Sequence, residues 1–186
     1  HRIDVSAVIS PHQKTAVDKA NFRELLVGML PQVLLVFWLV VSGWLLYRII
    51  RAHNYMNYLK RTSQPFDWGY LRRFESEFRA LCGLRRIEVR LTDKIPHPMA
   101  AGLGQPVILL PSRLLDELSE EDLRATILHE LTHLRRWDDW SKLGQKVVQA
   151  LVFFHPAVHW VGRHLDFERE VACDERVVEL TGNRSA

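Results

Sequence analysis

The stretch ILHELTHLRRWDDW, residues 127–140, places two histidines and an acid at a spacing that suits a metal ion. His129 and His133 are four residues apart, so on a helix both imidazoles project from one face. Neutral imidazoles at this separation can share one zinc ion, at about 2.0–2.1 Å each. Glu130 lies beside them, where it can take a proton from a metal-bound water. The stretch predicts an H-E-x-x-H zinc site; the plainer interpretation is two exposed histidines on a solvated helix.

Such a site needs a third protein ligand, which leaves the fourth position for water or substrate. The segment DFEREVACDERVVEL supplies Glu170, and Asp174 follows one helical turn later. A carboxylate at the second position can orient a ligating histidine by accepting its free N–H. Asp166, Glu170 and Asp174 are all acids at i,i+4 spacing and would repel one another on a purely solvated face. We therefore predict zinc on His129, His133 and Glu170, with Glu168 as the competing third ligand.

A longer version of the motif, H-E-x-x-H-x-x-G-x-x-H, is absent, because Arg136 and Asp139 occupy the Gly and last His positions. Asp139 could itself bind the metal, but without the glycine the chain would have difficulty turning it back. We expect instead that Asp138 or Asp139 caps the following helix. The group that stabilises the oxyanion is left open among three cationic residues, His164, Arg163 and Arg169.

The helix that carries the two histidines should begin at Ser119, since Ser119 and Asp122 form a capping-box-like start. An apolar stripe along it suits a core-facing side; its members are Leu123, Ile127, Leu131 and Leu134. Residues 86–91 alternate as a strand does, residues 106–110 read as a more buried strand, and Asp67 and Gly83 bracket another helix. These elements predict a mostly helical α+β fold, with a small sheet packed against the helix of His129.

Between the two metal-binding helices lies VVQALVFFHPAVHWVG, residues 147–162, which is too short to cross a bilayer. Pro156 should kink or break the helix there and let the chain reverse. The stretch could be core, or could lie in a membrane interface with its aromatic residues at headgroup level. We expect His155 and His159 to be structural.

Residues 25–47 contain no charged side chain, and a helix needs about 20 such residues to cross the hydrocarbon core. A long core helix would show a polar face, and a signal peptide would be followed by small residues, whereas Arg48 and Arg51 follow here. Basic residues after the run predict a cytosolic C-terminal side. We expect an extracytoplasmic segment at 1–24, a transmembrane helix with a cytosolic extension at 25–58, and a soluble domain at 59–186.

Composition excludes several other classes. The net charge of +3 is too small to indicate nucleic-acid binding, and no zinc-finger spacing or phosphate loop is present. Cys82 and Cys173 are the only cysteines and form no C-x-x-C, so neither a disulfide framework nor a thiol redox motif is expected. The chain begins with His1 rather than Met, which suggests a piece of a longer protein.

Four motifs in order carry a resemblance: PVILLPSRLL, LSEEDLRATILHELTHLRRWD, LVFFHPAVHW and FEREVACDE. They resemble the zinc peptidase domain of the bacterial β-lactam sensor-transducers and their stand-alone relatives, the antirepressor metallopeptidases. The resemblance implies a zincin-like fold, zinc on His129, His133 and Glu170, Glu130 as general base, and Asp174 matching the C-D step after the ligand glutamate. It also implies a cytosolic active site at the bacterial inner membrane. No C-terminal sensor is present in this sequence, so we expect a C-terminally truncated peptidase domain.

These features favour a membrane-anchored zinc endopeptidase that cleaves a protein near the cytosolic membrane face, in regulatory signalling. The substrate would be a cytosolic repressor or the protein itself, the other partner is membrane lipid, and no nucleic acid is expected. The alternative is a metal-binding signalling or scaffold protein without turnover. The strand at 106–110 is expected to offer an edge to an extended substrate.

Overall fold

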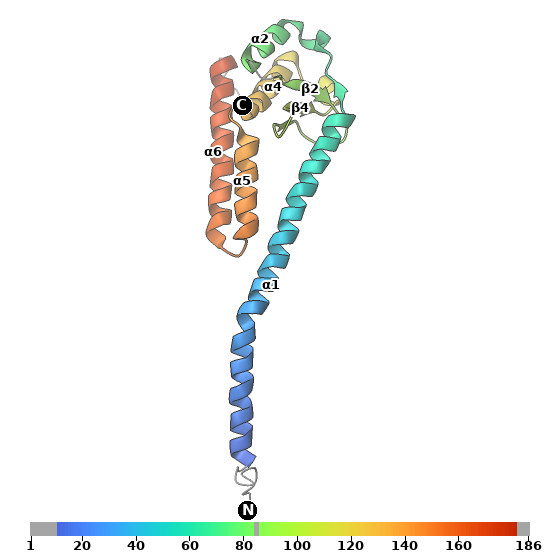
Figure 1. Ribbon diagram of the computed structural model, residues 1–186. Helices are drawn as coiled ribbons and strands as arrows, with labels where there is room; N and C mark the ends of the chain where they lie inside the picture. Colours follow the sequence, from blue (N-terminus) through green and yellow to red (C-terminus); the bar gives the residue numbers. More distant parts are fainter. Residues whose placement is uncertain (1–10, 84–85, 182–186) are drawn as a thin grey trace, which may run out of the picture. The chain divides into compact units, whose positions relative to one another are not determined.

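The computed structural model describes residues 11–83 and 86–181, and its backbone divides into two compact units, His1–Trp44 and Leu45–Ala186. The second unit combines helices with a small sheet, which confirms the predicted mostly helical α+β class (Figure 1). Residues 1–10 of the expected extracytoplasmic segment lie outside the described residues.

Helix α1 (Pro11–Thr62) is one continuous helix, as the uncharged run predicts, and it extends beyond both predicted ends. Its part from Val27 to Thr62 is long and apolar enough to cross a membrane. Large apolar side chains along it are exposed, for example Val27 at 70% and Phe37 at 58%. Exposed apolar surface is unfavourable in water by about 25 cal/mol per Å². This surface therefore suits lipid.

The sheet has four short strands in the order β1-β2-β4-β3. Their bounds are β1 (Gln64–Pro65), β2 (Glu88–Leu91), β3 (Met99–Ala101) and β4 (Val107–Leu110). β2 and β4 are parallel, whereas β1 and β3 pair antiparallel at the two edges. The two predicted strands are thus confirmed. The expectation that residues 106–110 offer a free edge is wrong, because β4 is paired on both sides.

β4 contributes to two apolar cores, one on each face of the sheet. Ile108 and Leu110 belong to the larger core, which includes the apolar side of α4 (Glu120–Arg135). Leu109, on the opposite face, packs in a second core with Leu59 from the last turn of α1. The sheet therefore fixes α4 on one side and the end of α1 on the other.

The start of α4 follows the predicted capping chemistry. The Ser119 hydroxyl accepts the Asp122 N–H at 3.2 Å and donates to the Asp122 carboxylate at 2.6 Å. The predicted apolar stripe is buried; its members Leu123, Ile127, Leu131 and Leu134 are at most 4% exposed. A fixed start and one buried side set which residues of α4 point away from the core.

Two short elements and one helix complete the side of α4 distant from α1. Asp67 caps the 3-10 helix η2 (Trp68–Leu71) rather than the longer helix itself. Helix α2 (Arg72–Cys82) follows and ends, as predicted, at Gly83, whose φ of 61° suits a glycine. Between β4 and α4 lies the single turn α3 (Leu114–Glu117).

A sharp reversal joins α4 to α5 (Asp138–Leu151). Trp137 occupies the N-cap position of α5 with φ 62° and ψ 31°, the left-handed conformation that non-glycine residues rarely adopt. The predicted cap by Asp138 or Asp139 is wrong: α5 has no side-chain cap, and both carboxylates are used elsewhere. The left-handed residue turns the start of α5 back against α4.

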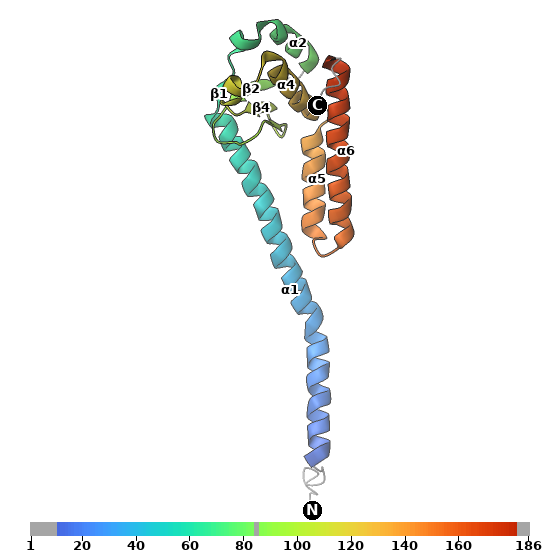
Figure 2. The ribbon, with the colours of Figure 1, turned by 180° about the vertical axis from the view of Figure 1, so that it is seen from behind.

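Helices α5 and α6 (Pro156–Thr181) form an antiparallel hairpin, in which they lie side by side in both views (Figures 1 and 2). Pro156 is the first residue of α6, where its missing N–H breaks no helical hydrogen bond. The predicted break at this proline is therefore confirmed. The other end of α6 packs against α4.

Candidate metal centre

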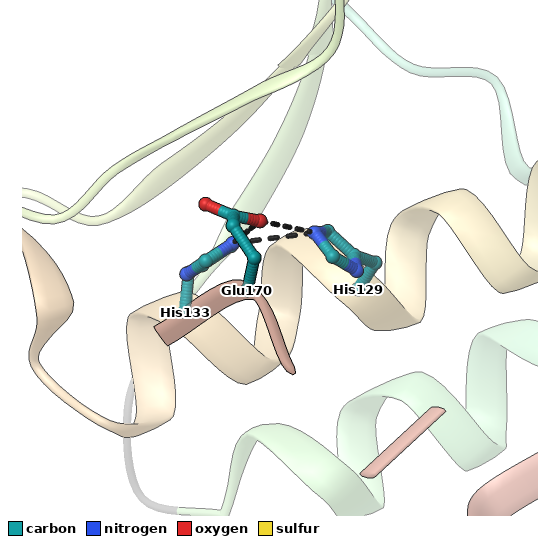
Figure 3. Close-up of side chains that lie close together, drawn as sticks. All are labelled: His129, His133 and Glu170. Atoms are coloured by element: carbon teal, nitrogen blue, oxygen red, sulfur yellow. Dashed lines mark hydrogen bonds and ion pairs between the residues drawn. The ribbon is translucent and has the colours of Figure 1, made fainter. Parts of the chain in front are cut away.

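Three side chains from two helices converge on one point (Figure 3). His129 and His133 project from α4, and their Nε2 atoms are 3.2 Å apart. The Glu170 carboxylate reaches them from α6, with Oε2 at 3.5 Å from each Nε2 atom. These are the three residues predicted as ligands from the sequence.

The spacing of these atoms matches the geometry of a four-coordinate zinc ion. With bonds of about 2.0–2.1 Å, the ligand atoms of a regular tetrahedron are about 3.3–3.4 Å apart. The observed separations of 3.2, 3.5 and 3.5 Å lie on either side of that value. Three such atoms would occupy three corners around a bound ion, which would leave the fourth for water or substrate.

Each histidine also has a carboxylate on its other ring nitrogen. Asp138 Oδ2 lies 2.8 Å from His133 Nδ1, and both side chains are under 10% exposed. Asp174 Oδ1 lies 3.2 Å from His129 Nδ1 but is 71% exposed. When Nε2 offers its lone pair to a cation, Nδ1 carries the proton and the carboxylate accepts it. Each imidazole could therefore bind a metal through Nε2 while its Nδ1 proton is accepted by a carboxylate.

The sequence pointed to Asp174 for this role and missed Asp138. Asp138 is only five residues from His133, a spacing at which two residues of a continuous helix do not face each other. The left-handed residue Trp137 breaks α4 and returns the chain, which brings the two side chains together. A short D-D pair directly after the motif was the available signal.

Cys173 completes the buried side of the centre. Its sulfur lies 3.3 Å from His133 Nδ1 and its thiol donates to Asp138 Oδ2 at 3.8 Å. Burial, together with the nearby Asp138 charge, raises the pKa of the Cys173 thiol to about 12. The neutral thiol packs behind His133, so this buried group belongs to the same centre.

Glu130 is adjacent to the converging ligands and largely screened from solvent. Burial raises the pKa of its carboxyl above the ordinary value of 4.5, while the two imidazoles and the Ala100 N–H lower it. Ala100 belongs to the edge strand β3, so the sheet anchors the carboxylate. A carboxylate with a raised pKa is a better proton acceptor, as a general base requires.

The alternative ligands lie elsewhere. Glu168 pairs with His164 at 3.6 Å, on its own helix. The Asp139 carboxylate accepts the Gly102 N–H, in the turn after β3. A side chain at Gly102 would collide with that carboxylate, since an added Cβ would lie 2.6 Å from Asp139 Oδ2. Neither acid belongs to the metal cluster found among the described residues.

Arg169, one of the three oxyanion candidates, is also used elsewhere. Its guanidinium donates to Ser141, Gln145 and Asp166, and the residue is 7% exposed. The bonds to Ser141 and Gln145 tie α6 to α5. The guanidinium therefore holds the hairpin together.

Comparisons with known proteins agree with this geometry. The sequence profile described as BlaR1 peptidase M56 matches residues 2–185. The regulatory protein BlaR1 of Staphylococcus aureus is 24% identical over 168 residues, which cover 90% of this chain and 28% of that protein. The methicillin resistance mecR1 protein of Staphylococcus epidermidis is 22% identical over 171 residues, covering 90% and 29%. A BlaR1 from Bacillus licheniformis is 27% identical over 85 residues, covering 46% and 14%.

The chain spans less than a third of the length of these relatives. The match to the family profile nevertheless extends over nearly every residue, including all four motifs that carry the resemblance. The chain belongs to the BlaR1 peptidase M56 family, a family of metallopeptidases.

Proposed function

We propose that this chain is a membrane-anchored, zinc-dependent endopeptidase with a zincin-like catalytic domain. The observation that carries the proposal is the trio of ligand atoms, 3.2–3.5 Å apart on His129, His133 and Glu170, with Glu130 beside it. A purely structural zinc site is closed by four protein ligands, whereas a catalytic site keeps one position open. Three ligands and an adjacent base favour catalysis.

Each residue of the centre has a role in peptide hydrolysis. Zinc bound there would polarise the scissile carbonyl and lower the pKa of the attacking water. Glu130 takes the proton from that water and delivers it to the leaving amine. Asp138 and Asp174 keep the imidazoles oriented through their Nδ1 protons.

The substrate would bind as an extended strand along β3. This strand pairs with β4 on one side only, and its residue Ala100 donates its N–H to Glu130. A peptide added to the free edge of β3 would be held by main-chain hydrogen bonds next to the catalytic carboxylate. The augmentation expected at residues 106–110 thus moves to the strand beside it.

Placement in the cell follows from the basic residues after the apolar run. Arg48, Arg51, Lys60 and Arg61 lie on the C-terminal side, one more than the three basic residues before the run (Lys14, Lys19 and Arg23), and an excess of such residues marks the cytosolic side of a span. We place residues 1–24 outside and the domain at 59–186 in the cytosol, at the bacterial inner membrane. The matched relatives include a protein named as regulatory. We infer a regulatory protein substrate, either a cytosolic repressor or the chain itself, and no nucleic-acid partner.

The substitution Glu130→Gln tests the proposal. It removes the base and leaves all three ligands, so zinc content should stay at one per chain while cleavage of a peptide library falls by about 10²–10⁴-fold. Glu121→Gln, an exposed change on the same helix, is the matched control and should retain both.

Two results would contradict the proposal. Cleavage that survives Glu130→Gln would remove the catalytic assignment. A wild-type chain that binds zinc and cleaves no peptide in the library or protein in its own membrane would favour the signalling or scaffold alternative.

A further inference from the structure

Polar side chains of α5 and α6 are hydrogen-bonded between the two helices of the hairpin. Ser141, Gln145 and Gln149 follow one another at four-residue intervals along α5, on the side that faces α6. The Gln145 amide donates to the Gly162 carbonyl at 3.0 Å, and the Gln149 amide donates to the Val158 carbonyl at 3.3 Å. In a hairpin surrounded by water, apolar side chains would fill this seam between the facing sides of α5 and α6.

The polar groups in this seam form hydrogen bonds and an ion pair with one another. Arg169 donates to Gln145 Oε1 at 2.9 Å and to Ser141 Oγ at 3.2 Å, and its charge is paired with Asp166 at 2.6 Å. Gly162 lets the helices approach closely, because an added Cβ would lie 2.1 Å from the Gln149 amide nitrogen. Small residues and interhelical hydrogen bonds are the contacts that hold helices together in lipid.

Large apolar side chains are exposed on the outward sides of the same hairpin. On α5, Trp140 and Val148 are each 52% exposed. Phe154 at the turn is 67% exposed, and Trp160, on the side of α6 away from Gly162, is 63% exposed. These values are similar to those of the apolar run in α1, where Val33 is 57% exposed. The hairpin therefore presents the same kind of surface as the segment that suits lipid.

A groove between the two helices adds to this surface. Its volume is about 440 Å³ and its walls are almost entirely apolar. Its apolar walls include Val148, Val158, Val161 and Leu165. A groove of this kind fits hydrocarbon better than it fits water.

Polar groups at the turn are satisfied without solvent. His159 Nε2 donates to the Phe153 carbonyl at 2.9 Å, and His155 Nδ1 accepts the Ala157 N–H at 3.2 Å. These bonds cover two backbone groups that the break between helices would leave open. The two histidines expected to be structural therefore close the tip of the hairpin.

Charge and length identify the kind of partner. Residues 147–162 contain no Asp, Glu, Lys or Arg, and Lys142, Lys146 and Arg163 flank them. Each leg of this stretch has five to seven helical residues and so measures about 8–10 Å. Interfacial helices enter the headgroup and acyl boundary to about 5–10 Å. The apolar tip has the length of the interfacial layer, and Lys142, Lys146 and Arg163 form a cationic collar around it. This length and this charge match an anionic bilayer surface.

We propose that the tip of the α5–α6 hairpin, residues 147–162, inserts into the interfacial layer of an anionic bilayer. Within the Leu45–Ala186 unit, the hairpin and the Leu45–Thr62 part of α1 extend from the sheet in the same direction in both views (Figures 1 and 2). The tip thus lies at the same end of this unit as Leu45. Apolar side chains point outward from both helices, which suits a fluid surface better than a single protein face.

Labelling the turn tests the insertion. The full chain with Cys82→Ser and Phe154→Cys is labelled with an environment-sensitive NBD group and reconstituted into phosphatidylcholine vesicles containing phosphatidylglycerol. Cys173 is 0% exposed and stays unlabelled, which the Cys82→Ser chain alone verifies. The label at 154 should emit at shorter wavelength and be quenched by doxyl groups on the acyl chains. The same label at Glu121→Cys, an exposed position on α4, should be quenched by aqueous iodide instead.

Removing the positive charges of the cationic collar provides a second test of the proposal. Lys142→Gln, Lys146→Gln and Arg163→Gln together, or vesicles of phosphatidylcholine alone, should reduce doxyl quenching at 154 while the chain stays in the membrane through α1. Iodide quenching at 154 equal to that at 121 would overturn the proposal. Protection from both quenchers, with crosslinking of 154 between two chains, would assign the surface to a second copy and would also overturn it.

Discussion

Helix α6 can be divided at Asp166 into two halves. Both halves bury one continuous side, but their exposed residues differ. Gly162, Arg169 and Cys173 are buried along the inner side, where they meet α5 and the metal-binding helix. In the half after Asp166 most exposed residues are acidic or basic, with Phe167 at 62% as the apolar exception, and Glu170 turns to the candidate metal cluster. In the half before it the outer side carries Trp160 and other apolar residues.

The difference between the exposed residues of the two halves shows that inward packing does not determine whether a helix faces water or lipid. Both halves use polar contacts inward, through the seam at one end and through the metal cluster at the other. Only the outward residues distinguish a half that faces water from a half that suits lipid. If both proposals hold, α6 connects the catalytic centre to a membrane surface over 26 residues.

We expect the largest effect from removing the third candidate ligand, in the half of α6 that contacts the metal cluster. Glu170→Ala removes one of three ligand atoms, so zinc affinity should fall by more than the roughly 10–100-fold that loss of a supporting carboxylate costs. The measurement is competition with a chromophoric chelator. Glu168→Ala, two residues away and paired with His164, is the matched control and should leave affinity unchanged. The opposite result would make Glu168 the ligand.

The next effect distinguishes the two orienting carboxylates. Asp138→Asn should lower zinc affinity by about 10–100-fold, because its bond to His133 is short and screened from water. Asp174→Asn should have a smaller effect, since Asp174 is 71% exposed and its oxygen lies 3.2 Å from His129. The same chelator competition measures both. Equal losses would show that exposure does not weaken the orienting bond.

The sequence predicted those parts of the site that depend on local periodicity. The four-residue spacing of His129 and His133, the cap at Ser119 and the apolar stripe of α4 all follow from one helix. Glu170 was found because a tetrahedral site needs an oxygen from another element, and the acids at four-residue intervals marked the second helix. Local periodicity was sufficient for the residues of α4, whereas on the second helix it left Glu168 in competition with Glu170.

The parts that it missed depend on contacts between distant segments. β3 has three residues and no readable alternation, and it exists because β4 pairs with it and α4 packs beside it. Asp138 acts through a left-handed residue at Trp137, a conformation that no pattern around a tryptophan predicts. The polar seam of the hairpin was invisible because Gln145 and Gln149 look like surface residues until α6 is placed against them.

We expect the smallest effects from substitutions in the hairpin. Gly162 and Gly144 form a matched pair there, one between the two helices and one in open space. An added Cβ at Gly162 would lie 2.1 Å from the Gln149 amide nitrogen and 3.0 Å from that of Gln145. Gly162→Ala should therefore displace the amides that bridge the helices and destabilise the chain by about 1–3 kcal/mol. The measurement is chemical unfolding in detergent, with zinc affinity measured in parallel.

Gly144, on α5, meets nothing within 4 Å, so Gly144→Ala should stabilise that helix by about 0.4–1 kcal/mol, because alanine loses less backbone entropy on folding. Zinc affinity should be unchanged in both variants, since neither glycine contacts the cluster. A Gly162→Ala chain that unfolds like the wild type would show that the polar seam is not what holds α5 to α6. A loss of zinc affinity in that chain would instead show that the two halves of α6 are energetically coupled.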